Sequence, residues 1–285
     1  MLRNVLLSLS LLLVLAICAM TVNCGGSSNS NTTTACTGGP YDVVGDWNLT
    51  FNGASGSAGV INTAGSALFF DSFGDVVVLP TVTGSCSFTG TSTLYESLPG
   101  GGETVAGPTT GNVTSDTSIT GTATSSSGTI TLSAAPISPF SGAPTALTGS
   151  QYLGVIEGDP DANIFELTLT PTGTGQGMTV SGTNVGDTCT VTGTLTQEGS
   201  NNVFDSVIAF SGSGCFFSSI NGLALESNSD YFTADGGAAG TYLYAISSSS
   251  PAVMEVYAET ADAGLSVRRR NAMKAGSPGH AHFSF

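Results

Sequence analysis

The chain has 285 residues, of which 20 are acidic and 5 are Lys or Arg, and its formal net charge is −15. Between Arg3 and Arg268 it contains no Lys, Arg or His. Within that window no imidazole can act as a general base and no cation can hold a phosphate. Serine and cysteine nucleophile triads, phosphate-binding loops and nucleic-acid binding are therefore excluded from the body of the protein.

The first 23 residues are predicted to form an export signal. A short cationic start, Met1–Asn4, precedes an apolar run from Val5 to Met20, and no basic stop-transfer cluster follows. This run is short for a membrane span and is typical of a secretory signal peptide. An uncleaved N-terminal anchor helix and a plain cleavage near Ala19 are the alternatives.

The segment that follows the apolar run begins with Cys24 and continues with small polar residues, Gly25–Asn31. It resembles bacterial lipoproteins, in which a cysteine at this place is acylated and becomes the first residue of the mature chain. The resemblance implies a lipid on Cys24, a flexible tether over 24–40, and an outer-membrane or cell-surface location, because Gly25 stands where the inner-membrane signal has Asp. The preceding Thr21-Val22-Asn23 departs from the usual pattern, and Cys18 is the alternative acylation site.

From residue 41 to 265, short runs alternate between apolar and polar residues and are separated by Gly, Asn, Asp and Ser. This period of two is typical of strands with one buried face, and no window over 41–264 has a helical period with caps. The apolar positions that share a face within each run are Trp47, Leu49 and Phe51; Ile130 and Leu132; Phe165, Leu167 and Leu169; Phe204, Ile208 and Phe210; Met254, Val256 and Ala258.

Many short strands with frequent turns predict an all-β, antiparallel fold, either an up-and-down barrel or a β-sandwich. A closed meander is favoured, because the body has no lysine with which to protect sheet edges. The segment that begins at Cys86 (CSFTGTST) is similar in sequence to the segment that begins at Cys189 (CTVTGTLT). This internal repeat indicates two related halves, 41–135 and 150–265. Residues 266–285 hold Arg268–Arg270, Lys274 and both histidines, and are predicted to be a disordered basic tail.

Four further cysteines, Cys36, Cys86, Cys189 and Cys215, indicate two disulfides in an exported chain. Pairing Cys36 with Cys86 and Cys189 with Cys215 is favoured, because each bond then closes a loop within one half. The alternative pairs Cys86 with Cys189 and Cys36 with Cys215. No Cys-x-x-Cys spacing points to zinc.

One acidic segment is a candidate calcium site. Asp159, Asp161 and Asn163 place oxygen ligands at alternating positions, which suits a hard cation. The segment lacks the glycine and the final glutamate of an EF-hand loop, and a turn between two strands is the alternative. No other cofactor is expected.

The favoured function is that of a non-catalytic, lipid-anchored envelope or surface protein that binds a small neutral or apolar ligand or mediates adhesion, with its anchor in the membrane. A structural component of the envelope, in contact with an envelope polymer, is the alternative, and a carboxylate-dependent hydrolase is less favoured. A pocket lined by Phe204, Phe210, Phe216 and Phe217 would favour ligand binding; a filled core with flat exposed strands would favour adhesion or assembly.

The unpaired acids also predict a pH dependence. Carboxylates brought together without cations should have raised folded pKa values, so the body should be at least as stable near pH 4 as at pH 7.

Overall fold

The structure is a computed structural model of the whole chain. It describes residues 41–71, 74–96, 104–125, 128–137, 149–157, 164–172, 177–184, 186, 188–198, 202–228 and 241–258. The described residues all belong to one compact unit of the chain. Sixteen strands and no α-helix occur in the described residues.

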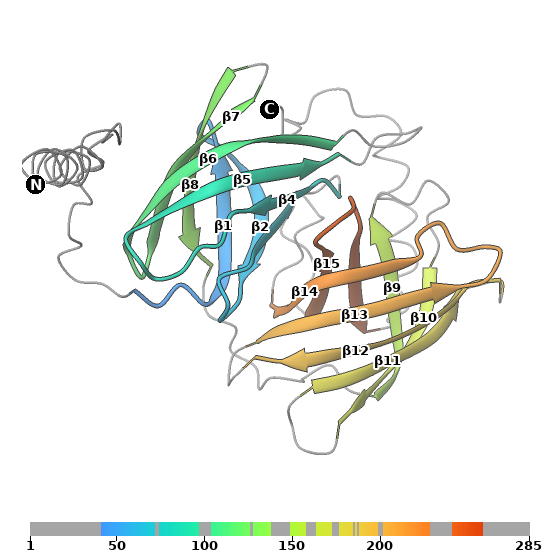
Figure 1. Ribbon diagram of the computed structural model, residues 1–285. Coiled ribbons are helices and arrows are strands. Elements are labelled where there is room, and N and C mark those ends of the chain that lie inside the picture. Colours follow the sequence, from blue (N-terminus) through green and yellow to red (C-terminus); the bar gives the residue numbers. More distant parts are fainter. Residues whose placement is uncertain are drawn as a thin grey trace, which may run out of the picture. The chain divides into compact units, whose positions relative to one another are not determined.

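The first eight strands form a closed antiparallel barrel in which each strand pairs with the next (Figure 1). The last strand pairs with the first, with Trp47 opposite Pro136, and this pairing closes the barrel. The strands are β1 (Gly45–Phe51), β2 (Ala54–Ile61), β3 (Ala67–Asp71), β4 (Val76–Leu79), β5 (Ser87–Tyr95), β6 (Thr104–Ser115), β7 (Ser118–Ser125) and β8 (Gly128–Pro136).

The remaining eight strands form a second closed antiparallel barrel. Its first strand pairs with its last, with Val253 opposite Glu157, and with the second strand on its other side. The strands are β9 (Gly149–Glu157), β10 (Ile164–Pro171), β11 (Gly177–Asn184), β12 (Thr190–Gln197), β13 (Val203–Ser211), β14 (Ser219–Ser227), β15 (Tyr242–Ser247) and β16 (Val253–Ala258).

The predicted all-β antiparallel fold from two halves is therefore confirmed, in its up-and-down barrel form. Local chemistry accounts for the hairpins. Between β1 and β2 the chain reverses at Asn52 and Gly53, whose φ angles of 47° and 82° are those of a two-residue hairpin turn that asparagine and glycine tolerate.

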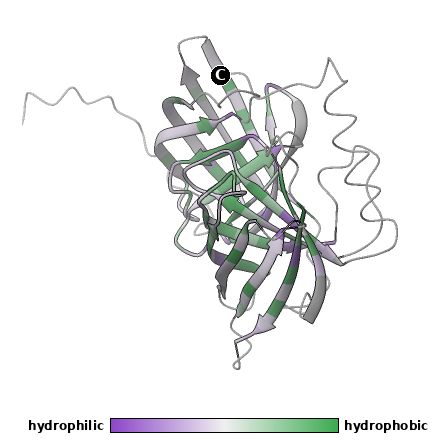
Figure 2. Ribbon diagram, turned by 90° about the vertical axis from the view of Figure 1, so that its right-hand side faces the viewer, coloured by the Kyte–Doolittle hydropathy of each residue, from purple (hydrophilic) through white to green (hydrophobic). Residues whose placement is uncertain are grey.

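Each barrel is filled by its own inward side chains. Trp47, Leu49 and Phe69 belong to one continuous apolar cluster inside the first barrel, and Phe165, Phe204 and Met254 to another inside the second. Hydrophobic residues alternate with more polar ones along many of the strands (Figure 2). The interior is thus a packed core, as the period of two predicts.

A third apolar cluster joins the two barrels. It combines Leu68, Phe70 and Val76 of the first barrel with Tyr244 and Ile246 of the second. The rings of Phe70 and Tyr244 lie 5.2 Å apart between centroids. On β3 and β15 every residue is buried, because one face points into the barrel and the other into this contact.

The two copies of the repeated motif lie on β5 and β12, the fifth strand of one barrel and the fourth of the other. Its mid-strand glycines are closely approached: a Cβ on Gly90 would lie 2.8 Å from Pro80 Cβ, and one on Gly193 would lie 2.5 Å from the Val207 carbonyl oxygen. No helix in the described part of the chain is long and apolar enough to cross a membrane.

Candidate functional site

The outward face of β10–β13 in the second barrel carries rows of hydroxyl side chains, here called the second hydroxyl face. Strand pairing aligns its exposed residues into cross-strand rows. The two central rows are Thr168, Ser181, Thr192 and Ala209, and Thr170, Thr179, Thr194 and Val207. These rows contain no charge; the exposed carboxylates Glu166 and Asp205 belong to the rows on either side.

The outward face of β5–β8 in the first barrel repeats this arrangement and is called the first hydroxyl face. Its rows again contain no charged residue. The full rows are Ser87, Asn112, Thr120 and Ser133, and Thr89, Thr110, Thr122 and Thr131; Thr91 also lies opposite Pro108, and Thr124 opposite Thr129.

Sheet geometry sets the spacing of these hydroxyls at about 4.8 Å across strands and about 6.7 Å along them. Neighbouring hydroxyls are close enough to bond to each other: Thr190 Oγ1 lies 2.7 Å from Ser211 Oγ, and Thr110 Oγ1 lies 3.4 Å from Thr122 Oγ1. Each threonine thus presents a methyl group and a hydroxyl at a fixed position. Such a face can exchange hydrogen bonds with a neutral partner but offers it no cation.

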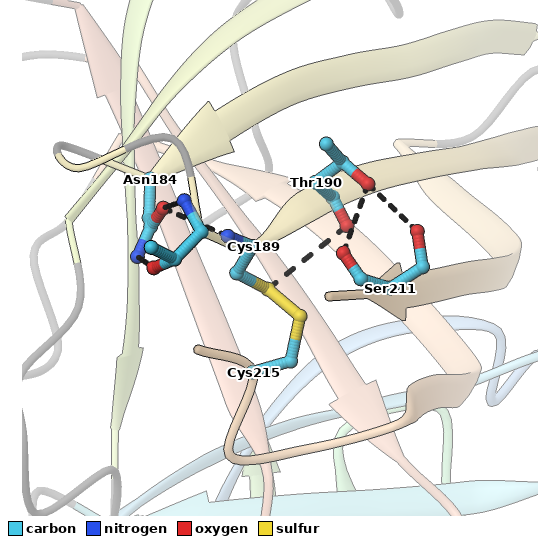
Figure 3. The surroundings of a disulfide bond; sticks show 6 residues. Asn184, Cys189, Thr190, Ser211 and Cys215 are labelled. Carbon is cyan, nitrogen blue, oxygen red and sulfur yellow. Dashed lines mark hydrogen bonds between the residues drawn. A yellow bond between two sulfur atoms is a disulfide. The ribbon is translucent and has the colours of Figure 1, made fainter. Parts of the chain in front are cut away.

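A disulfide fixes a loop beside the second hydroxyl face. Cys189, which precedes β12, is bonded to Cys215 in the loop that follows β13 (Figure 3). Asn184 stabilises the segment that leads into Cys189, because its Oδ1 accepts hydrogen bonds from the backbone N–H groups of Thr188 and Cys189, each at 3.0 Å. The loop presents Phe216 with 55% of its surface exposed, next to the bonded cysteine.

The Cys189–Cys215 prediction is confirmed. Cys86 is also disulfide-bonded, while Cys36, its predicted partner, lies outside the described residues. The predicted lipidation site Cys24 and the predicted calcium ligands Asp159, Asp161 and Asn163 also lie outside them and stay predictions. In the described part of the chain no group of three or more His, Cys, Asp or Glu residues could hold a metal ion.

The four phenylalanines that the sequence suggested as pocket walls do not share one environment. Phe204 and Phe210 are buried in the core of the second barrel, and Phe217 packs against that core. Phe216 points away from it and contacts Phe217 edge-on, with ring centroids 4.8 Å apart. Two of the four are therefore core residues rather than walls of an open pocket.

Polar residues cross the contact between the barrels at one place, called the acidic seam: Asp46, Asn62, Thr63, Glu198, Asn202 and Asp205. In its first bridge, Asn202 Nδ2 donates to Asp46 Oδ2 at 2.9 Å and also to the Glu226 carbonyl. The Asn202 carbonyl accepts from the Glu226 N–H at 3.0 Å. Burial raises the pKa of Asp46 to about 7, and the Asn202 hydrogen bond opposes this rise.

In the second bridge of the seam, the Glu198 carboxylate receives three hydrogen bonds from the first barrel. The donors are Thr63 N–H at 2.7 Å, Thr63 Oγ1 at 2.7 Å and Asn62 Nδ2 at 3.1 Å. Partial burial raises the pKa of the neighbouring Asp205, and the charge of Glu198 and a hydrogen bond to it raise it further. Asp205 therefore keeps its proton to a higher pH than an isolated aspartate does.

Sequence reasoning missed the acidic seam and the apolar contact around it. A signal was present, since Ala67–Phe70, Val76–Leu79 and Tyr242–Ile246 are continuous apolar runs among alternating ones. Such runs are typical of strands buried on both faces. Nothing in the sequence pairs Asp46 with Asn202, because they are separated by 156 positions.

A scan against protein-family models and a search of curated proteins found no match. Among solved structures, a crystal structure described as that of "a putative outer membrane protein" from Bacteroides fragilis is similar at 13% identity. The similarity covers 76% of this chain and 98% of that chain, with a TM-score of 0.25.

Proposed function

We propose that this protein is an exported, lipid-anchored, non-catalytic surface protein that adheres to a neutral, hydroxyl-rich polymer through its two hydroxyl faces. The observation that carries the proposal is the presence of charge-free rows of hydroxyl side chains on each face. A neutral glycan is a partner of matching chemistry, because its hydroxyls both donate and accept hydrogen bonds and it bears no charge that an acidic protein would repel.

The packing inside the barrels supports an exterior site. Lipocalin-like binding needs an interior with room for a ligand, whereas here the inward side chains of each barrel form a continuous core. The exposed faces are where side chains remain available for a partner. Phe216, exposed beside the second hydroxyl face, adds an aromatic surface on which a sugar ring can rest.

The cysteine and tether segment supplies the anchor in this proposal. A lipid on Cys24 and the tether over 24–40 would hold the barrels at the outer membrane or cell surface. The Cys189–Cys215 disulfide suits an oxidising compartment outside the cytoplasm. Labelling with a radioactive fatty acid should mark the wild type and the Cys18→Ala variant; label retained in Cys24→Ala would contradict the anchor.

Binding of the lipid-free protein to an array of immobilised neutral and acidic polysaccharides tests the proposed function. We expect retention on a neutral polysaccharide that is lost when Thr122→Asp and Thr192→Asp place a carboxylate on each face, and kept in Thr122→Ser with Thr192→Ser. Thr117→Asp, in the exposed turn after β6, is a matched charge control that should bind normally. Binding as strong as that of the wild type when both aspartates are present, or binding to acidic polysaccharides alone, would overturn the proposal.

A further inference from the structure

The two bridges of the acidic seam join the same ends of the two barrels. Asp46 and Asn62 lie at adjacent ends of β1 and β2, whose pairing sets Gly45 opposite Ile61. Glu198 and Asn202 flank the connection from β12 to β13, which are also neighbours. One corner of the first barrel is therefore held by one hairpin of the second, through contacts that each include a carboxyl group.

The first bridge fits a neutral Asp46 better than a charged one. The residue is 9% exposed, its Oδ2 accepts from Asn202, and its Oδ1 has no hydrogen-bond partner among the described residues. A buried carboxylate needs several donors or a cation to replace its lost hydration. The described part of the chain contains no Lys, Arg or His that could act as that cation.

The second bridge places Asp205 beside Glu198. Glu198 uses both oxygens as acceptors for the three donors of Asn62 and Thr63. Asp205 is hydrogen-bonded to Glu198 and to Asn62, and a proton on Asp205 can be donated to Glu198. When Asp205 loses that proton, two carboxylates face each other beside the contact with the first barrel.

We propose that the acidic seam is an acid-favoured latch, which holds this corner of the two barrels closed while Asp46 and Asp205 are protonated and loosens as they ionise. The apolar cluster of Phe70 and Tyr244 keeps the barrels together in both states, so the change is local. Among the described residues, the titratable groups bonded to Asp46, Asp205 or their partners are Glu198 and, through its main chain, Glu226; both are acidic and neither can neutralise the charge that forms.

The Thr63 amide reports on the latch directly, because its hydrogen is bonded to Glu198 Oε2 across the seam. We would measure its hydrogen exchange in the full-length protein from pH 4 to pH 8 and correct for the intrinsic rate. Its protection should fall as pH rises, by up to about tenfold per pH unit for each proton that the seam loses. Asp46→Asn and Asp205→Asn should each flatten this slope, whereas Glu166→Gln, on an exposed face, should keep it.

The proposal is overturned if Thr63 protection does not change with pH in the wild type. It is also overturned if Asp46→Asn and Asp205→Asn both retain the wild-type slope. Should Asp46→Asn fail to fold, Asp205→Asn alone decides, because Asp205 lies on the exposed face of β13 where asparagine fits without repacking. These readouts do not involve the polysaccharide, so the latch and the proposed function stand or fall separately.

Discussion

The side-chain amide of Asn202 donates one hydrogen to Asp46 Oδ2 in the other barrel at 2.9 Å and its second to the Glu226 carbonyl of its own barrel. Both hydrogens of one amide group are thus engaged, one across the contact and one within the second barrel, and a reciprocal bond from Glu226 N–H to the Asn202 carbonyl fixes the residue that donates them. Asp46 is therefore oriented by a single partner that is itself held on two sides, so the geometry of this bridge is set by the second barrel.

Removing the Asn202 side chain should lower the free energy of unfolding most when Asp46 is charged. We expect Asn202→Ala to lower the free energy of unfolding by about 1–3 kcal/mol, the range for a buried polar group that loses its partner. The loss should be larger at pH 8 than at pH 4, because a neutral carboxyl needs the donor less. Urea unfolding at both pH values checks this, with exposed Asn48→Ala as the control. An equal loss at the two pH values would contradict it.

The whole protein should lose stability as pH rises from about 4 to about 7. Burial raises the pKa of Asp46 from 3.8 to about 7, so the folded state binds a proton that the unfolded state releases in this range. The stability linked to that proton is fully present below pH 4 and is lost by the time pH passes 7. The change is at most about 4 kcal/mol for a pKa rise of this size, because loosening of the seam limits the loss. Urea denaturation at half-unit pH steps measures it, and Asp46→Asn should reduce the decline.

The sign of this pH effect could be predicted from the sequence, but its cause could not. The absence of cations between Arg3 and Arg268 indicated raised pKa values through repulsion among the acids. At Asp46 the largest cause is burial against the other barrel, and at Asp205 burial again precedes the effect of Glu198. Burial of a particular carboxyl depends on which faces of the barrels meet, which the period of two along a strand does not encode.

The difference between local strand geometry and long-range contacts also decides which other parts of the fold could be predicted from the sequence. Alternation at Trp47, Leu49 and Phe51 depends on strand geometry alone, so the strands and their buried faces follow from the sequence. Barrel and sandwich share that alternation, and the choice between them rests on the pairings of β8 with β1 and of β16 with β9. Cys189 and Cys215 could be paired because their separation of 26 residues lies within one half.

The apolar contact between the barrels should contribute strongly to stability. Phe70 is fully buried in it against Tyr244, and Phe70→Ala should cost about 3–5 kcal/mol, the usual loss for a large aromatic side chain in a core. Phe216→Ala, at an exposed position, should change stability by less than about 0.5 kcal/mol. Thermal and urea unfolding of both variants compare them. Similar losses of stability in the two variants would show that the contact between the barrels is not a packed core.

The disulfide should stabilise the second barrel through its closed loop. Cys189 and Cys215 are separated by 26 residues, and a loop of that length gives about 2–4 kcal/mol. We expect the double variant Cys189→Ala/Cys215→Ala to lose this amount in urea unfolding. In the wild type, reduction should cause a loss of similar size that the double variant does not show. A double variant as stable as the oxidised wild type would contradict the prediction.

Gly193 should be among the least replaceable residues of the second barrel. A Cβ there would lie 2.5 Å from the Val207 carbonyl oxygen and 2.9 Å from Ile208 Cα, both backbone atoms of the paired strand β13. Because backbone cannot rotate away as a side chain can, Gly193→Ala must push β12 and β13 apart, at a cost of about 1–3 kcal/mol or more. Gly186→Ala is the matched control, since nothing lies within 4 Å of its added Cβ. Differential scanning calorimetry should show a lowered Tm for the first variant alone, and an unchanged Tm for Gly193→Ala would mean that the two strands do not approach this closely in solution.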